Sequence, residues 1–161
     1  MDFLLQIWSL IHKKHQDWKL IIVGGAGKEL NLMKKYACSL GLENVFFEGV
    51  QDPIKYYQKA SIFCMTSVIE AFGIVLIEAM NMKVIPFAFK SFSTVNDIID
   101  HNINGILIPP FNKELYAEKL SELMSDDNLR CEFCNNAYIK SLQFQMDVVG
   151  RKWLTLFSYL A

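Results

Sequence analysis

Short, continuous runs of apolar residues recur along this 161-residue chain, and longer segments with helical periodicity separate them. Each run is about four residues long, rich in β-branched or aromatic residues, and bounded by Gly, Pro, Asn or Ser. The runs are Leu20–Val23, Val45–Phe47, Ile62–Met65, Val84–Phe87 and Ile106–Ile108. Because their apolar residues are continuous rather than alternating, these runs predict strands that are covered on both faces of a sheet.

The segments between the apolar runs predict helices. Residues 28–40 place apolar side chains at spacings of three and four, and Gly41 follows as a C-terminal stop. Further helices are predicted over residues 3–14, 53–59, 73–82, 112–124, 126–140 and 146–160, with Ser125 or Asp126 as a cap between two of them. Strands that alternate with helices predict an α/β domain with a parallel sheet of about five strands and right-handed crossovers.

The first predicted element is unusual for such a domain. Residues 3–14 form an amphipathic pattern with no strand before it, although a doubly wound domain normally opens with a strand. We therefore expect the sequence to begin inside a larger protein.

The composition excludes several classes of protein. With 52% hydrophobic, 13% aromatic and 20% charged residues, the chain is too apolar for a disordered tail and long enough to bury a core. A net charge of −1 gives no electrostatic argument for binding nucleic acid or an anionic membrane. No apolar run approaches the roughly 18 residues of a membrane span. Asp2 stands where a signal peptide would be basic, so we expect a cytoplasmic protein.

The metal-binding residue types lack a metal-binding pattern. Cys131 and Cys134 form a single CxxC pair, whereas a zinc site needs a second pair. No Asp-x-Asp pair is present to hold a divalent cation against a diphosphate. We expect no metal, and structural or surface roles for the remaining candidates, Cys38, Cys64, His12, His15 and His101.

A glycine turn follows the first strand, at Gly24-Gly25-Ala26-Gly27-Lys28. Such a turn lets the backbone approach a ligand closely. It does not match a dinucleotide fingerprint, because Leu30 stands where Gly or Ala belongs, and it does not match a P-loop, because Glu29 replaces Ser or Thr. A simple tight turn and a ligand-binding loop both remain open for this segment.

The third strand leads into the most informative segment, Thr66–Glu78. Glu70 lies in its loop, and a helix is expected to begin near Gly73, where free N–H groups and the helix dipole suit a phosphate. The carboxylate of Glu78 leans back toward that helix end. Carboxylates accept hydrogen bonds from sugar hydroxyls. Two of them beside an anion site would therefore suit a nucleotide that carries a sugar. The alternatives are a surface loop acid or cap for Glu70 and a solvated helix face for Glu78.

These segments carry a resemblance to a known family. In order along the chain they are LIIVGGAG, LGLENVFFEGV, KASIFCMTS, EAFGIVLIEAM and INGILIPP, and the two glutamates in the EAFG context are the most specific feature. Over almost its whole length, the chain resembles the C-terminal nucleotide-sugar-binding domain of the retaining GT-B glycosyltransferases (glycosyl transferases group 1), which build capsules, lipopolysaccharides and related glycans.

The resemblance implies a Rossmann-like three-layer α/β/α fold, the C-terminal half of a GT-B enzyme. Residues 1–161 would then be the donor domain of a larger two-domain enzyme, truncated at its N-terminus. It also implies a UDP-sugar or GDP-sugar donor, retaining chemistry without a metal, and a glycan or lipid-linked acceptor bound by the N-terminal domain. The full-length enzyme would work in the cytoplasm, at the inner face of the membrane, in surface polysaccharide biosynthesis.

The resemblance also assigns roles to individual residues. Glu70 would contact hydroxyls of the donor sugar, and Glu78 would bind the ribose hydroxyls. The backbone around the first turn of the helix would face the sugar and the diphosphate, and two glycine turns would border the base. These backbone positions are Phe72, Gly73, Ile74 and Val75 for the helix, and Gly24, Gly25, Gly27, Gly49 and Val50 for the turns.

Three departures from the family pattern bear on these expectations. Ala71 replaces a glycine, Ser93-Thr94 replaces a glycine-rich turn, and Asp97 replaces a glutamate, which we expect to alter the choice of sugar. The arginine and lysine with which the family clamps the diphosphate precede the first helix and have no counterpart here. We therefore expect this chain alone to bind the donor weakly, not to turn over, and to expose an apolar edge or cover it by dimerising. The alternative functions are a non-catalytic nucleotide-binding module and an NAD-type oxidoreductase domain that uses the Gly24 turn.

Overall fold

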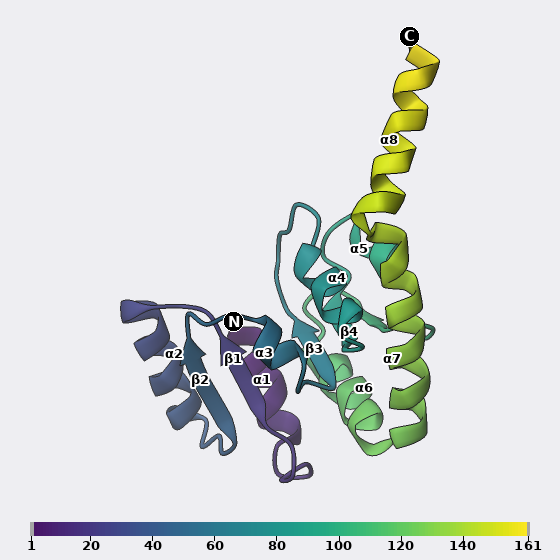
Figure 1. Cartoon of the computed structure of the whole chain (residues 1–161). Helices are drawn as coiled ribbons and strands as arrows, with labels where there is room; N and C mark the ends of the chain where they lie inside the picture. Colours follow the sequence, from purple (N-terminus) through teal and green to yellow (C-terminus); the bar gives the residue numbers. More distant parts are fainter. Residues whose placement is uncertain (1, 161) are drawn as a thin grey trace.

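The computed structural model describes residues 2–160 and contains five strands with helices between them (Figure 1). The strands are β1 (Leu20–Val23), β2 (Val45–Gly49), β3 (Ile62–Met65), β4 (Ile85–Phe89) and β5 (Ile106–Ile108). β1, β3 and β5 have the bounds that their apolar runs predict, whereas β2 and β4 each end two residues later. The prediction of an α/β fold with about five strands is confirmed.

The predicted helices are also present. They are α1 (Asp2–Ile11), α2 (Gly27–Ser39), α3 (Ile54–Tyr57), α4 (Ile74–Asn81), α6 (Lys113–Ser125), α7 (Asp127–Ser141) and α8 (Met146–Leu160). Asp126 rather than Ser125 caps α7, because its Oδ1 accepts the Leu129 N–H at 2.9 Å. Two short elements, α5 (Val95–Ile98) and the 3-10 helix η1 (Leu142–Phe144), were not predicted.

The strands form two parallel sheets instead of the single sheet that the sequence predicts. β1 pairs with β2, and β4 lies between β3 and β5 in the second sheet. Leu20 is opposite Val45 in the first sheet, and Ile62 is opposite Ile85 in the second. β1 and β3 share no ladder, and the only element that precedes β1 in the described chain is the helix α1. Among residues 2–160, β1 therefore pairs on one edge with β2 alone, and β3 pairs on one edge with β4 alone.

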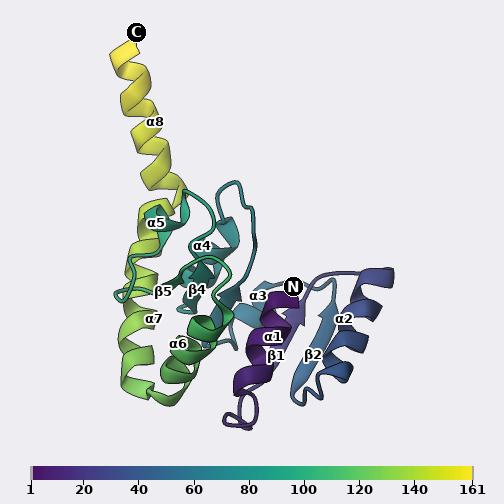
Figure 2. The same ribbon diagram turned by 180° about the vertical axis from the view of Figure 1, so that it is seen from behind.

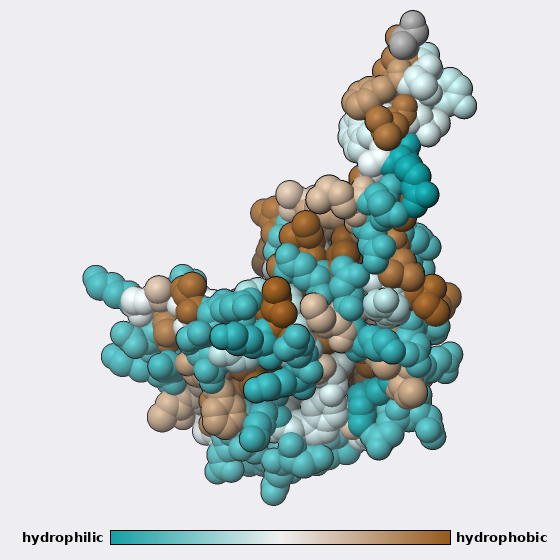
Figure 3. Space-filling view, in the orientation of Figure 1, coloured by the Kyte–Doolittle hydropathy of each residue, from teal (hydrophilic) through white to brown (hydrophobic). Residues whose placement is uncertain are grey.

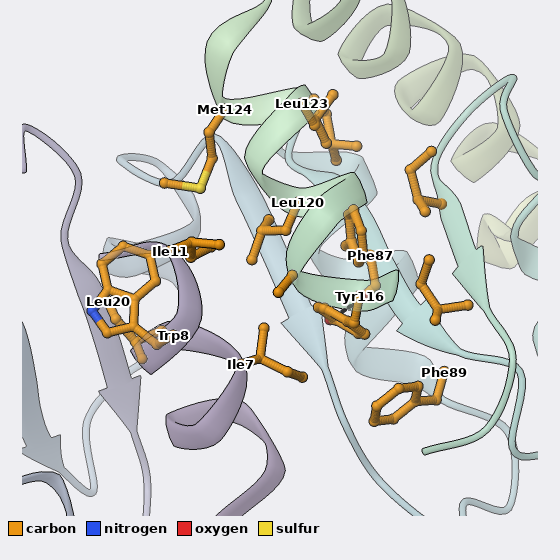
Figure 4. Packing of buried hydrophobic residues seen from close by; sticks show 14 of the residues in the cluster. Ile7, Trp8, Ile11, Leu20, Phe87, Phe89, Tyr116, Leu120, Leu123 and Met124 are labelled. Carbon is orange, nitrogen blue, oxygen red and sulfur yellow. Dashed lines mark hydrogen bonds between the residues drawn. The ribbon is translucent and has the colours of Figure 1, made fainter. Parts of the chain in front are cut away.

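Helices cover both faces of the second sheet, which gives the three layers that were predicted. On one face, α1 and α6 lie side by side over both sheets (Figures 1 and 2). Between these helices and the sheets, Trp8 of α1, Phe87 of β4 and Leu120 of α6 are buried in one cluster (Figure 4). On the other face of the second sheet, Leu76 of α4 and Ala137 of α7 are fully buried. Apolar burial of this extent is the dominant stabilising contribution to such a fold.

The last helix stands apart from these layers. α8 projects away from the body of the domain, and none of its described side chains is buried (Figures 1 and 3). Its predicted apolar face is exposed, with Trp153, Leu156, Phe157 and Leu160 all solvent-accessible. No helix within residues 2–160 is long and apolar enough to cross a membrane.

Candidate functional site

The two predicted glycine turns meet at the carboxyl edge of the first sheet. The Gly24 N–H donates to the Gly49 carbonyl at 2.6 Å, which places the end of β1 against the end of β2. Gly24, Gly25 and Gly27 have φ values of 106°, 76° and 62°, in the region that side chains strain to adopt. Gly49 lies within 4.0 Å of the Gly25 carbonyl, measured from the Cβ it lacks. The backbone of both turns therefore lies together at the ends of β1 and β2.

The loop between β3 and α4 is tied to the loop that follows β4. The Ser91 hydroxyl donates to the Ser67 carbonyl at 2.7 Å, and the Thr94 hydroxyl donates to the Phe72 carbonyl at 3.2 Å. The Phe72 ring also meets Phe144 edge-on, with ring centroids 6.2 Å apart. These contacts support the backbone on either side of Glu70, whose side chain is half-buried.

The N-terminus of α4 is open. Gly73 precedes the helix in the left-handed conformation, with φ 84°, and no side-chain hydrogen bond caps the helix. Ile74, the first helical residue, is 62% exposed. An uncapped helix N-terminus offers backbone N–H donors and the positive end of the dipole to an anion. This is the geometry that the sequence predicts for a phosphate site.

A cavity of about 1070 Å³ lies between β1 and β3, and it brings together part of the predicted site. Gly24, Val50, Val75 and Glu78 line it. The other predicted site residues lie outside this lining: Gly25, Gly27, Gly49, Glu70, Phe72, Gly73 and Ile74. The cavity lining thus includes part of each predicted group: Gly24 and Val50 from the turns, and Val75 and Glu78 from α4.

Two residues of the cavity wall were not predicted as part of the site. Tyr57 of α3 donates from its hydroxyl to Oε2 of Glu78 at 3.5 Å, and the neighbouring Tyr56 donates to Oε2 of Glu48 at 3.1 Å. Burial, followed by the Glu78 carboxylate, raises the pKa of Tyr57 to about 12. The phenol therefore stays protonated near neutral pH and orients the Glu78 side chain. The helical pattern of residues 53–59 shows only that Tyr57 is on a helix, so this contact had no signal in the sequence.

The two glutamates are available to a ligand. None of the ion pairs among residues 2–160 includes Glu70 or Glu78. Glu78 is exposed apart from its contact with Tyr57. Carboxylates of this kind accept hydrogen bonds from sugar hydroxyls.

His15, His101 and Cys64 are held in contacts within the fold. Nε2 of His15 lies 2.8 Å from Oγ of Ser121, and Nδ1 of His101 accepts the Leu107 N–H at 3.0 Å. Burial raises the pKa of the Cys64 thiol to about 12, which makes it a poor nucleophile. Within residues 2–160 no three His, Cys, Asp or Glu side chains come together in a way that could hold a metal ion.

Comparison with known proteins identifies the family. Residues 1–140 match the family described as glycosyl transferases group 1. An uncharacterized glycosyltransferase of Haemophilus influenzae is 30% identical over 154 residues, which are 94% of this chain and 43% of the relative. A Campylobacter jejuni protein, the GalNAc-alpha-(1->4)-GalNAc-alpha-(1->3)-diNAcBac-PP-undecaprenol alpha-1,4-N-acetyl-D-galactosaminyltransferase, is 29% identical, over 96% of this chain and 43% of the relative.

A solved structure agrees with this match. A mutant form of S. aureus TarM, in complex with fondaparinux, alpha-GlcNAc-glycerol and UDP, superposes with a TM-score of 0.87 at 32% identity. The match covers 97% of this chain and 32% of the TarM chain. The present chain thus spans less than half the length of the curated relatives it matches. Its fold is that of the Rossmann-like C-terminal domain of GT-B enzymes. The chain belongs to the glycosyl transferases group 1 family.

Proposed function

We propose that residues 1–161 are the donor-binding domain of a two-domain glycosyltransferase. The donor is a UDP-sugar or a GDP-sugar, and the acceptor is a glycan or a lipid-linked glycan of surface polysaccharide biosynthesis. The match of residues 1–140 to the family carries this proposal. The name of the Campylobacter jejuni relative, which includes an undecaprenol-linked acceptor, and the UDP bound to TarM support it.

In this proposal the nucleoside binds at the mouth of the cavity. Glu78 accepts hydrogen bonds from both ribose hydroxyls, and Tyr57 holds its carboxylate in place from 3.5 Å away. The base lies against the backbone of the Gly24 turn and of Gly49–Val50, where the absence of side chains on the glycines allows close approach.

The diphosphate and the sugar extend toward the N-terminus of α4. Backbone N–H groups at Gly73 and Ile74 face the diphosphate, and Val75 lies beside it. Glu70 contacts the sugar hydroxyls from the loop that Ser91 and Thr94 support. Because the helix end stabilises the negative charge that develops on the departing diphosphate, this arrangement suits transfer without a metal ion. Retention of configuration is part of the proposal on the resemblance to the retaining enzymes alone.

The proposal assigns the rest of the reaction to parts of the enzyme outside this chain. The N-terminal domain binds the acceptor and completes the cleft, in the cytoplasm at the inner face of the membrane. The chain described here therefore binds the donor weakly and does not catalyse transfer on its own.

Saturation-transfer NMR tests the proposal with five ligands: UDP, UDP-glucose, UDP-GlcNAc, GDP-mannose and NAD. We expect magnetisation transfer to the ribose and base protons of at least one sugar nucleotide, and competition by the matching free diphosphate. The same titrations with the full-length enzyme control for weak binding by this domain alone. Transfer to NAD without transfer to any sugar nucleotide would overturn the proposal in favour of an oxidoreductase domain.

A further inference from the structure

A second cavity, of about 460 Å³, lies between α1 and α6, which run side by side (Figure 2). We call it the α1–α6 pocket. The turn after α1 is at the amino ends of the strands, because Asn44 accepts the first N–H of β1 and also donates to the Gln16 carbonyl at 2.9 Å. The α1–α6 pocket, which Lys14 of this turn lines, is therefore separate from the donor site at the carboxyl ends. Its volume is within the range of small-molecule sites.

Three polar side chains meet at the wall of the α1–α6 pocket. Nζ of Lys14 donates to Oγ of Ser121 at 3.0 Å, and Nε2 of His15 lies 2.8 Å from the same Oγ. The ammonium group of Lys14 can only donate, so the hydroxyl keeps its own proton for an acceptor. Among the described residues, the Ser121 hydroxyl makes no hydrogen bond to a second acceptor, so its proton points to Nε2 of His15. A hydroxyl that donates to an imidazole is the arrangement of an activated nucleophile and its base.

The burial of these groups gives the cluster a direction. Ser121 and Lys14 line the α1–α6 pocket, whereas His15 does not. The His15 side of the cluster is closed from solvent, since this residue is 5% exposed. A molecule in the α1–α6 pocket would therefore meet the Ser121 hydroxyl and the Lys14 ammonium, with the His15 ring behind them.

The charges around His15 favour the form that can take a proton. Burial, followed by the charge of Lys14, lowers the pKa of His15, and Asp17 opposes this change. On the α6 side, Glu118 and Glu122 line the α1–α6 pocket. With its pKa below 6.5, the imidazole is neutral near neutral pH and is able to act as a general base.

The ammonium group of Lys14 has donors to spare. None of the ion pairs among residues 2–160 includes Lys14, and its contact with Ser121 uses one of its three N–H groups. The other two are available to an oxygen atom in the α1–α6 pocket. A cationic donor beside a nucleophile stabilises the negative charge that develops on the carbonyl oxygen during acyl transfer.

The lining of the α1–α6 pocket indicates which acyl group fits. Leu10, Ile11 and Ala117 supply an apolar surface, and Leu10 is 58% exposed. Three carboxylates on successive turns of α6 also line it: Glu114, Glu118 and Glu122. Carboxylates repel an anionic ligand, so the α1–α6 pocket suits a neutral molecule with a short apolar group.

From these observations we propose that Ser121 is the nucleophile of a second reactive site, in the α1–α6 pocket, which takes short acyl groups from neutral esters. Oγ of Ser121 attacks the carbonyl carbon of the ester, and its proton passes to Nε2 of His15. The bond between this carbon and the alkoxy oxygen breaks, and His15 returns the proton to the departing oxygen. The acyl group stays on Ser121 as an ester until a water molecule, deprotonated by the same ring, releases it as a carboxylic acid and restores the hydroxyl.

Reaction with p-nitrophenyl acetate, a neutral activated ester, tests the proposal. The chain and the full-length enzyme are each treated near neutral pH, and p-nitrophenolate release is followed by absorbance. We expect a burst of one p-nitrophenolate per chain, and peptide mass spectrometry should find the acetyl group on Ser121. Hydroxylamine should remove it, because it is an ester, whereas acetyl-lysine is an amide and resists. The anionic ester mono-p-nitrophenyl succinate should react about tenfold more slowly.

Variants separate a reactive serine from a hydrogen bond that only joins two helices. Ser121→Ala should abolish the burst. Ser125→Ala is the matched control on the same helix, since its hydroxyl donates only to the Ser121 carbonyl, at 2.9 Å, and it should keep the wild-type rate. His15→Gln should slow acetylation about 100-fold or more. The wild-type rate should level off above about pH 6.5, where the His15 ring is neutral. Circular dichroism of each variant confirms that it is folded.

Three outcomes would overturn the proposal: no acetyl group on Ser121, a burst of equal size in Ser121→Ala, or equal rates in folded His15→Gln and the wild type. A rate that keeps rising above about pH 9, with acetyl groups on lysines alone, would assign the reaction to surface amines. These measurements involve no nucleotide, so their outcome is independent of the proposed donor binding.

Discussion

The substitution Gly73→Ala tests whether the start of α4 has the backbone geometry on which the phosphate site depends. Gly73 has φ 84°, where an L-residue costs roughly 1–2 kcal/mol. A Cβ at this position would lie 3.0 Å from Cζ and 3.1 Å from Cε2 of Phe92, so the ring would also have to move. Strain and crowding together predict a loss of about 2 kcal/mol in the free energy of unfolding.

Thermal unfolding followed by circular dichroism measures this loss. For a domain of this length, about 2 kcal/mol lowers the Tm by roughly 4–8 °C. Urea unfolding should show a lower midpoint with an unchanged slope, because the buried surface does not change.

Gly150→Ala is the matched control, since it makes the same chemical change inside a helix and not at the residue before one. Gly150 lies in α8 without a positive φ, and nothing is within 4 Å of the Cβ that it lacks. Helix propensity predicts that this change is neutral or adds up to about 1 kcal/mol. Equal stability of Gly73→Ala and the wild type would refute the reasoning, as would an equal loss in both variants.

Three further predictions concern the core, the pH dependence and the site. Tyr116→Phe removes the buried hydroxyl that donates to the Phe87 carbonyl at 2.7 Å, so urea unfolding should show a loss of about 1–3 kcal/mol. Burial and the charge of Lys14 lower the pKa of His15 below its ordinary 6.5, so the unfolded state binds more protons than the folded state. The free energy of unfolding should therefore fall as the pH drops below about 6.5. Urea unfolding of His15→Gln at several pH values should show a smaller fall. In the full-length enzyme, calorimetry should show that Glu78→Ala lowers the affinity for UDP about tenfold, whereas Glu70→Ala should mainly lower the affinity for the sugar-bearing donor. Equal UDP affinity in the wild type and Glu78→Ala would contradict the role assigned to Glu78.

Most of the secondary structure could be predicted because its causes are local. The β3 run Ile62–Met65 is apolar and β-branched or aromatic at its start, and its strand has the predicted bounds. Gly41 and Asp126 end or begin helices through their own backbone or side-chain chemistry. The start of α4 near Gly73 could also be predicted, because a glycine before an apolar helical pattern is a local signal.

The features that depend on long-range contacts could not be predicted in this way. The hydroxyl of Tyr57 reaches Glu78 across 21 residues of sequence, and neither helical pattern shows that contact. The division into two sheets depends on which strands pair, and the apolar runs do not indicate which strands are neighbours. The short helix α5 has a fully buried Val95 and Ile98, but four residues are too few for a periodic signal.

Backbone chemical shifts during a titration with UDP-glucose test the central claim most directly. The account predicts that the largest shifts of the amide signals fall on the Gly24 turn, on Gly49–Val50 and on the first turn of α4, including Val75, with smaller shifts for UDP alone at the α4 end. Unchanged signals at these positions, or shifts that instead cluster on α8 or on the α1–α6 face, would contradict the claim that this chain is a donor-binding domain.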